Sequence, residues 1–111
     1  MPDFPATQEI PAKKIHFSGI PEGVDKQLLA SDAEKSFDRL AGILNSELAL
    51  EAHFKDIRKH GGGEKVEVRV KAVTPREHFH ASANAWRIEN ALKAALLILE
   101  KEARNAKSKK S

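Results

Sequence analysis

The side chains in this 111-residue chain that are best suited to chemistry are its cations, 19 lysines and arginines against 16 acidic residues. The excess lies in two segments: residues 55–76 hold seven basic and three acidic residues, and residues 101–111 hold five and one, so each segment has a net charge of +4. Electrostatic attraction acts over about one Debye length, ~8–10 Å at moderate salt. A polyanion would therefore meet the protein through these two segments, and the alternative is that the charges only keep the surface solvated.

The first basic segment has the pattern of a strand hairpin with a flexible tip. Val66, Val68 and Val70 alternate with polar residues after the triple glycine at 61–63, and another alternating segment precedes it. Glycines make a mobile loop, so cations beside them can become ordered on a phosphate backbone. The basic residues of this hairpin are Lys55, Arg58, Lys59, Lys65, Arg69 and Lys71.

The second candidate is the outer face of a C-terminal helix. If Leu92 and Leu99 face the core, an aromatic residue and several cations recur on the opposite side at steps of three and four residues. An indole there could stack on a base, worth ~1–3 kcal/mol, while the cations contact phosphates. The alternative is that the indole folds onto the first helix or the N-terminal arm, because large aromatics are usually mostly buried. This row and the basic end of the chain comprise Trp86, Lys93, Lys101, Arg104 and Lys107.

Four histidines alternate onto the polar side of the predicted strands, at positions His16, His53, His78 and His80. Clustered imidazoles bind zinc, but no ligand spacing in the sequence supports a site, so we expect ordinary exposed pairing between strands and neither a metal nor a cofactor. The chain has no cysteine, which excludes disulfides and thiolate nucleophiles. It also lacks a Walker phosphate loop, a GxSxG elbow and an HExxH helix, so we expect neither an enzyme nor a small-molecule substrate.

Alternation of polar and apolar residues predicts four strands, and apolar steps of three and four residues predict two helices. Asp25 is in position to cap the first helix, and Ser31 with Glu34 forms a second capping candidate. Because each strand has one apolar and one polar face, the order βαβββα indicates an α+β fold with a four-stranded antiparallel sheet and two helices packed on one face. The strands are expected at 14–18, 47–55, 65–72 and 78–81, and the helices at 25–44 and 84–107.

The length suffices for one compact domain and not for two. Three prolines predict a flexible N-terminal arm over 1–12, followed by a single domain over 13–107 and a basic tail over 108–111. No apolar run approaches the ~20 residues that a bilayer requires, and the first residues do not have the pattern of a secretory signal. We therefore expect a cytoplasmic protein without a membrane partner.

Five short segments of the chain match a known family in register: Phe17-Ser18-Gly19 at the end of the first strand, Glu34 to Leu40 in the first helix, Lys65-Val66-Glu67-Val68 in the third strand, His80-Ala81-Ser82-Ala83 before the last helix and Ala91-Leu92 within it. By these segments the chain resembles the short form of the ribosome hibernation factors, the family of hibernation promoting factor and ribosome-associated inhibitor A. The resemblance extends over 13–110, nearly the whole chain. The family's acidic, tyrosine-containing start of that helix is replaced here by the residues at 86–90.

The resemblance implies a non-enzymatic, stress-related protein that binds ribosomal RNA in the small-subunit cleft for messenger and transfer RNA and inhibits translation. By the same resemblance, the ribosome contacts in the first helix fall on Lys35 and Arg39. Those in the last helix fall on Lys93, Lys101 and Arg104. Two alternatives remain: a double-stranded-RNA-binding-like domain, and a protein-interaction module that pairs through its open sheet face or edge. The sequence leaves the choice between monomer and dimer open.

Overall fold

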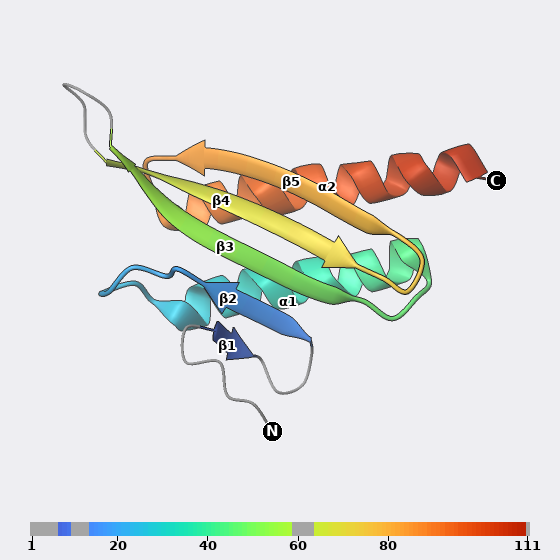
Figure 1. Ribbon diagram of the computed structural model, residues 1–111, viewed down its shortest axis with the longest axis horizontal. Coiled ribbons are helices and arrows are strands. Elements are labelled where there is room, and N and C mark those ends of the chain that lie inside the picture. The colour runs from blue at the N-terminus through green and yellow to red at the C-terminus, as the bar shows by residue number, and fades with distance from the viewer. Residues whose placement is uncertain (1–6, 10–13, 59–63, 111) are drawn as a thin grey trace.

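The order of helices and strands confirms the predicted βαβββα arrangement and adds one short strand in front of it. A computed structural model describes residues 7–9, 14–58 and 64–110, with side chains over 14–57 and 65–108. The elements are β1 (Thr7–Glu9), β2 (Ile15–Ser18), α1 (Lys26–Leu44), β3 (Ala49–Arg58), β4 (Glu64–Val73), β5 (His78–Ala85) and α2 (Ile88–Lys110). The fold is therefore α+β, and both helices lie on the same side of the sheet (Figure 1).

The sheet is mixed, so the expectation of a purely antiparallel sheet is wrong at one pair of strands. The strand order is β1-β2-β3-β4-β5, and all neighbours are antiparallel except β2 and β3, which run parallel with Ile15 opposite Leu50. The chain between β2 and β3 crosses one face as α1, and such a helical crossover returns the chain in the same direction. The strands still show one polar face each, because both helices cover the same side.

The predicted four-stranded sheet corresponds to β2–β5, and β1 extends it at the β2 edge. Thr7 pairs with Ser18 in antiparallel register, within the segment that the prolines had suggested to be an arm. The three residues of β1, Thr7–Glu9, lie between Pro5 and Pro11 in the sequence. They therefore keep the backbone N–H groups that a strand ladder requires, which a proline would remove.

The first helix begins and ends where its capping residues predict. The Asp25 carboxylate accepts hydrogen bonds from the backbone N–H groups of Gln27 and Leu28, at 3.0 and 3.3 Å. At the other end, Asn45 adopts a left-handed conformation with φ of 49° and donates its N–H to the Ala41 carbonyl at 2.8 Å. These contacts satisfy backbone groups that a helix end leaves unpaired. The alternative cap, Ser31, lies inside the helix.

The second helix begins four residues later than predicted, because β5 is longer. Ala81, Ala83 and Ala85 point toward the helices while the residues between them are exposed, so the strand pattern continues to Ala85. The ladder with β4 extends as far, with Val66 opposite Ala85. The sequence prediction ends the strand at Ala81 and begins the helix at 84, so it places Ala85 in the helix; the pairing of Ala85 with Val66 instead continues the strand.

The core is a single apolar layer between the sheet and the helices. Phe17, Leu50 and Val68 enter it from the strands, and Leu40 and Leu99 from the helices, each 2% exposed or less. The rings of Phe17 and Phe54 meet edge to face, with centroids 5.8 Å apart. No helix within the described parts of the chain is long and apolar enough to span a membrane.

Gly19 follows the last residue of β2, where the chain lies close against the backbone of β3. Its φ is +76°, and a Cβ atom built there would lie 2.3 Å from the carbonyl oxygen of Phe54. That oxygen belongs to the backbone of a central strand, so it cannot move aside cheaply. Glycine is required here both for its backbone conformation and for its small size.

We expect Gly19→Ala to lower the free energy of unfolding by about 2–4 kcal/mol, because it adds a steric clash to an unfavourable φ. Gly42→Ala is the matched control, because that glycine lies in α1 with no atom within 4 Å of the added methyl group. It should raise the stability by ~0.5–1 kcal/mol. Urea unfolding curves of the two variants measure both effects, and equal effects would contradict the proposed contact.

Glu89, in the first turn of α2, has a lowered pKa. The largest cause is a hydrogen bond from its own backbone N–H, followed by the opposing effect of desolvation and the attraction of Arg87, which it meets at 2.8 Å. A carboxylate with a lowered pKa in the folded chain stabilises that chain above its ordinary pKa, and the stabilisation is lost as the pH falls through the lowered value. The charge also favours the helix N-terminus.

Glu89→Gln should therefore lower the melting temperature slightly at pH 7. The difference from the unsubstituted chain should disappear as the pH is lowered well below the ordinary carboxyl pKa of about 4.3. Thermal melts from pH 8 to pH 3 measure this. Glu102→Gln, the same change in the second half of α2, controls for the loss of one negative charge; a difference for Glu89→Gln that is independent of pH would argue against the assignment.

Candidate nucleic-acid interface

Three cations that the sequence placed on different helices meet in one groove. Lys35 and Arg39 of α1 and Lys93 of α2 line a groove of about 240 Å³ between the helices, on the side of the molecule away from the sheet. The remaining lining residues are Asp32, Leu96, Leu97 and Glu100. We call this surface the helical groove. Because α1 and α2 pack directly on each other, cations 54 or more positions apart in sequence, such as Arg39 and Lys93, act as one patch.

Glu100 of α2 lies buried at the floor of the helical groove and connects the two helices through its carboxylate. The residue is 1% exposed, and its carboxylate accepts hydrogen bonds from Ser36 Oγ at 2.7 Å and from Arg39 Nε and Nη2 at 2.8 and 3.2 Å. Arg104 lies one turn further along α2, with its Nη2 3.9 Å from the same carboxylate. The hydrogen bond with Glu100 is the main reason that the pKa of Arg39 is raised. A buried carboxylate is therefore neutralised by a guanidinium that remains half exposed at the surface.

Sequence reasoning missed Ser36 and Glu100, although a signal was present. Both occupy core-facing positions of otherwise apolar helix faces, Ser36 between Ala33 and Leu40 and Glu100 next to Leu99. Polar groups at such positions are rarely buried without partners. A search for polar residues on the two apolar helix faces would have found this pair, but not the geometry that joins it to Arg39.

The helical groove also contains a carboxylate that is poorly satisfied. One oxygen of Asp32 is buried and has no hydrogen-bond partner among the described residues. Asp32 and the exposed amines of Lys35 and Lys93 line the same space. With Glu100 already paired to Arg39, the cations of the groove outnumber its unpaired carboxylates, so the surface favours an anion.

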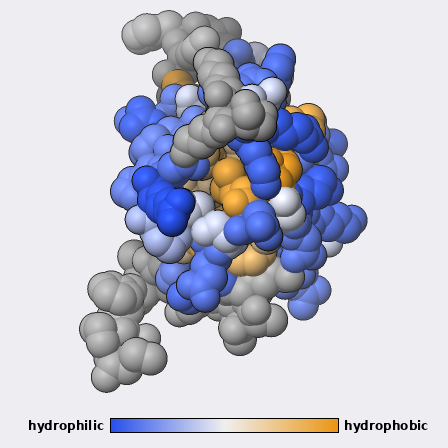
Figure 2. All heavy atoms as spheres, turned by 90° about the vertical axis from the view of Figure 1, so that its right-hand side faces the viewer, coloured by the Kyte–Doolittle hydropathy of each residue, from blue (hydrophilic) through white to orange (hydrophobic). Residues whose placement is uncertain are grey.

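The other predicted cations of α2 do not all join the helical groove. Arg104 is adjacent to it through Glu100, and Lys101 is exposed on the same helix. Lys107 lies apart, in a groove of about 390 Å³ where it is accompanied by Leu44 and Pro75. Figure 2 shows this end of the molecule, where a small apolar area is surrounded by hydrophilic side chains.

Trp86 is not part of the cation row on α2, so that element of the sequence prediction is wrong. It precedes the helix, which begins at Ile88. Its ring is 57% exposed and faces the ammonium group of Lys65, 4.9 Å from the ring centroid. Nor is the indole buried against α1, the alternative considered from the sequence. The tryptophan instead directly follows β5, whose last residue, Ala85, pairs with Val66 of β4.

The cations of the hairpin lie on the opposite side of the sheet from the helices. Val66, Val68 and Val70 of β4 point into the core, so the alternate residues Lys65, Arg69 and Lys71 point away from it. Lys55 of β3 lies on the same side and is exposed. The side chain of Arg58 and all of Lys59 fall outside the described residues. Apart from Lys107, the predicted binding residues whose side chains are described therefore fall on two surfaces, one on each side of the sheet.

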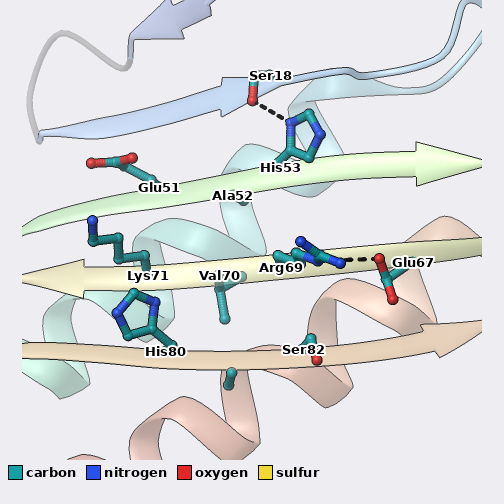
Figure 3. Close-up of a pocket in the computed structure, with 11 residues that line it drawn as sticks. Ser18, Glu51, Ala52, His53, Glu67, Arg69, Val70, Lys71, His80 and Ser82 are labelled. Atoms are coloured by element: carbon teal, nitrogen blue, oxygen red, sulfur yellow. Dashed lines mark hydrogen bonds and ion pairs between the residues drawn. The ribbon is translucent and has the colours of Figure 1, made fainter.

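The uncovered side of the sheet carries a shallow depression of about 530 Å³. Figure 3 shows His53, Arg69, Lys71 and His80 standing on this side, with the helices behind the strands. Ser18 Oγ lies 2.8 Å from Nδ1 of His53, which fixes that ring. We call this surface the open sheet face.

The histidines of the open sheet face do not form a metal site. Among the residues that the structure describes, no group of three or more histidine, aspartate or glutamate side chains could hold a metal ion. His16, His53 and His80 are separated by charged neighbours in the strand register, such as Glu51 opposite His16 and Lys71 opposite His80. The strand register also places Ser18 beside His53.

We expect Arg39→Ala to lower the free energy of unfolding by about 2 kcal/mol. The effect should be smaller than for a fully buried ion pair, because the guanidinium is half exposed and Ser36 and Arg104 remain near Glu100. Lys35→Ala, one turn earlier in the same helical groove, should change stability by less than ~0.5 kcal/mol. Urea unfolding measures both, and a similar loss for the two variants would show that the Glu100 pair does not stabilise the helix packing.

Comparison with known proteins agrees with the fold. No protein-family profile matches the chain, and no curated protein does. Among solved structures, the chain is similar to the N-terminal domain of Protein Y from Thermus thermophilus, with a TM-score of 0.61 and 18% sequence identity. The match covers 89% of this chain and 99% of that domain. The βαβββα arrangement described above is thus the fold of the Protein Y N-terminal domain.

Proposed function

We propose that the protein is a non-enzymatic RNA-binding domain that associates with the small ribosomal subunit, occupies its cleft for messenger and transfer RNA, and inhibits translation during slow growth or stress. The observation that carries this proposal is the helical groove, where Lys35, Arg39 and Lys93 converge from two helices. The resemblance to the ribosome hibernation factors implies ribosome contacts at these three positions. Similarity of fold to the Protein Y domain supports the same assignment.

The helical groove suits folded RNA because its cations are held at fixed positions. Arg39 is anchored by two hydrogen bonds to a buried carboxylate, so little side-chain freedom is lost when its exposed edge meets a phosphate. Lys93 and Lys101 flank Leu97, an apolar side chain that is 63% exposed and offers a surface for a sugar or a base. Binding of this kind blocks a cleft by occupying it. No catalytic step, cofactor or small-molecule substrate is needed, and the cytoplasm is where such a partner is found.

The two alternatives are less well supported by the geometry. A double-stranded-RNA-binding domain would place free cations at the start of the last helix, but Arg87 there is paired with Glu89 at 2.8 Å. A protein-interaction module could use β5, which is an edge strand of eight residues in the described sheet. Strand addition at that edge would depend on backbone hydrogen bonds and would respond little to salt.

The triple variant Lys93→Ala, Lys101→Ala, Arg104→Ala tests the proposed function. We expect it to bind purified small subunits ~10- to 100-fold more weakly at about 0.1 M salt. The negative slope of log affinity against log salt should also become less steep by about three, one for each lost phosphate contact. Cosedimentation over a salt series measures both quantities. The variant should also fail to inhibit translation in a cell-free system.

A variant with the same loss of charge on the other side of the sheet is the matched control. Lys65→Ala, Arg69→Ala, Lys71→Ala should retain most of the affinity for small subunits, because these residues lie on the open sheet face. Thermal melts confirm that both variants are folded. If the unsubstituted protein does not sediment with small subunits even at low salt, or if the two triple variants lose affinity equally, the proposed function is wrong.

A further inference from the structure

The open sheet face carries a row of cations that the helical groove does not use. Lys65, Arg69 and Lys71 project from the same side of β4, and Glu67 lies between Lys65 and Arg69. Alternate residues of a strand are ~6.8 Å apart, close to the separation of successive phosphates in an extended single strand, so Arg69 and Lys71 match neighbouring phosphates and Lys65 lies about two such steps from Arg69. Arg69 is held by Glu67 through an exposed pair at 3.2 Å, which solvent screens, so its guanidinium remains accessible to a stronger anion.

Trp86 stands at one end of this row. It is the only tryptophan of the chain, it is 57% exposed, and Lys65 lies against its ring. A large exposed aromatic beside a lysine is costly to leave in water, because the indole has apolar surface that it could bury. Base stacking would bury that surface, and the ammonium group of Lys65 would lie close to the phosphate that adjoins the stacked base.

Hydrogen-bonding side chains run beside the cations on β5. In the strand register, His80 is opposite Lys71, Ser82 is opposite Arg69, and Asn84 is opposite Glu67, and all three are exposed. The depression of the open sheet face lies between this row and His53, as Figure 3 shows. Donors and acceptors at this spacing, on a rigid sheet, could contact bases or sugars along a strand that follows β4.

We propose that the open sheet face binds an extended single strand of nucleic acid, with a base stacked on Trp86, one phosphate on Lys65, two neighbouring phosphates on Arg69 and Lys71, and one uncontacted phosphate between Lys65 and Arg69. An acidic peptide would meet the same cations, but it would leave the indole uncovered. The face is on the other side of the sheet from the helical groove, so this proposal goes beyond the proposed function and does not depend on it.

The fluorescence of Trp86 provides a direct test, because no other tryptophan contributes. Titration of the full chain with a twelve-nucleotide oligouridylate at low salt should quench this fluorescence saturably. The slope of log affinity against log salt should be about −2, the value for three phosphate contacts on a single strand. The triple variant Lys65→Ala, Arg69→Ala, Lys71→Ala should lose the quenching, whereas Lys93→Ala, Lys101→Ala, Arg104→Ala should retain it.

A second readout separates stacking from charge. With a fluorescein-labelled oligouridylate, anisotropy should show that Trp86→Ala binds ~5- to 100-fold more weakly, while Trp86→Phe, which keeps an aromatic ring, should lose less. Absence of quenching at low salt, equal quenching by a polyglutamate peptide, or equal losses in the two triple variants would each overturn the proposal. Oligouridylate binding without sedimentation on small subunits would instead overturn only the proposed function.

Discussion

The packing of the two helices depends on one buried charge. Glu100 of α2 is almost fully enclosed, and its carboxylate is neutralised by Arg39 and hydrogen-bonded by Ser36, both from α1. A carboxylate in that position is unfavourable without such partners, so the two helices are constrained to the one relative placement that brings Ser36 and Arg39 to it. An apolar residue would pack in several registers. The ion pair thus fixes the spacing of the cations above it.

This constraint separates the molecule into two chemically different sides. On one side, α1 and α2 form a rigid surface in which cations are set by helix packing. On the other, β4 and β5 present alternate side chains at the repeat of a strand, with Trp86 at the end. A convex pair of helices suits the grooves of folded RNA, and a flat sheet suits an extended strand. The same small core supports both, because each strand buries only one of its faces.

Much of the fold was predictable from local patterns, and the errors have physical causes. Alternation located the strands, and the Asp25 carboxylate marked the start of α1. The parallel direction of β2 and β3 was indicated by the strand–helix–strand order, because a helical crossover returns the chain in the same direction, but the one-sided burial of each strand favoured an antiparallel sheet. The predicted start of α2 at 84 is too early because β5 continues in pairing with β4 as far as Ala85, and this error also placed Trp86 on the helix. Once Ala85 is paired with Val66, Trp86 must lie at the end of the sheet. The helical groove was predictable as two sets of cations, but its common floor at Glu100 required the packing itself.

The short length of β1 limits how copies of this chain could associate through the edges of their sheets. In the described sheet, one outer edge is formed by β1, which has three residues, and the other by β5, which has eight. A three-residue edge offers too few backbone groups to hold a partner strand, whereas an eight-residue edge offers enough. If two copies joined across β5 with two-fold symmetry, the described β1 strands would form the two outer edges of the combined sheet, and each would offer only three residues for further pairing.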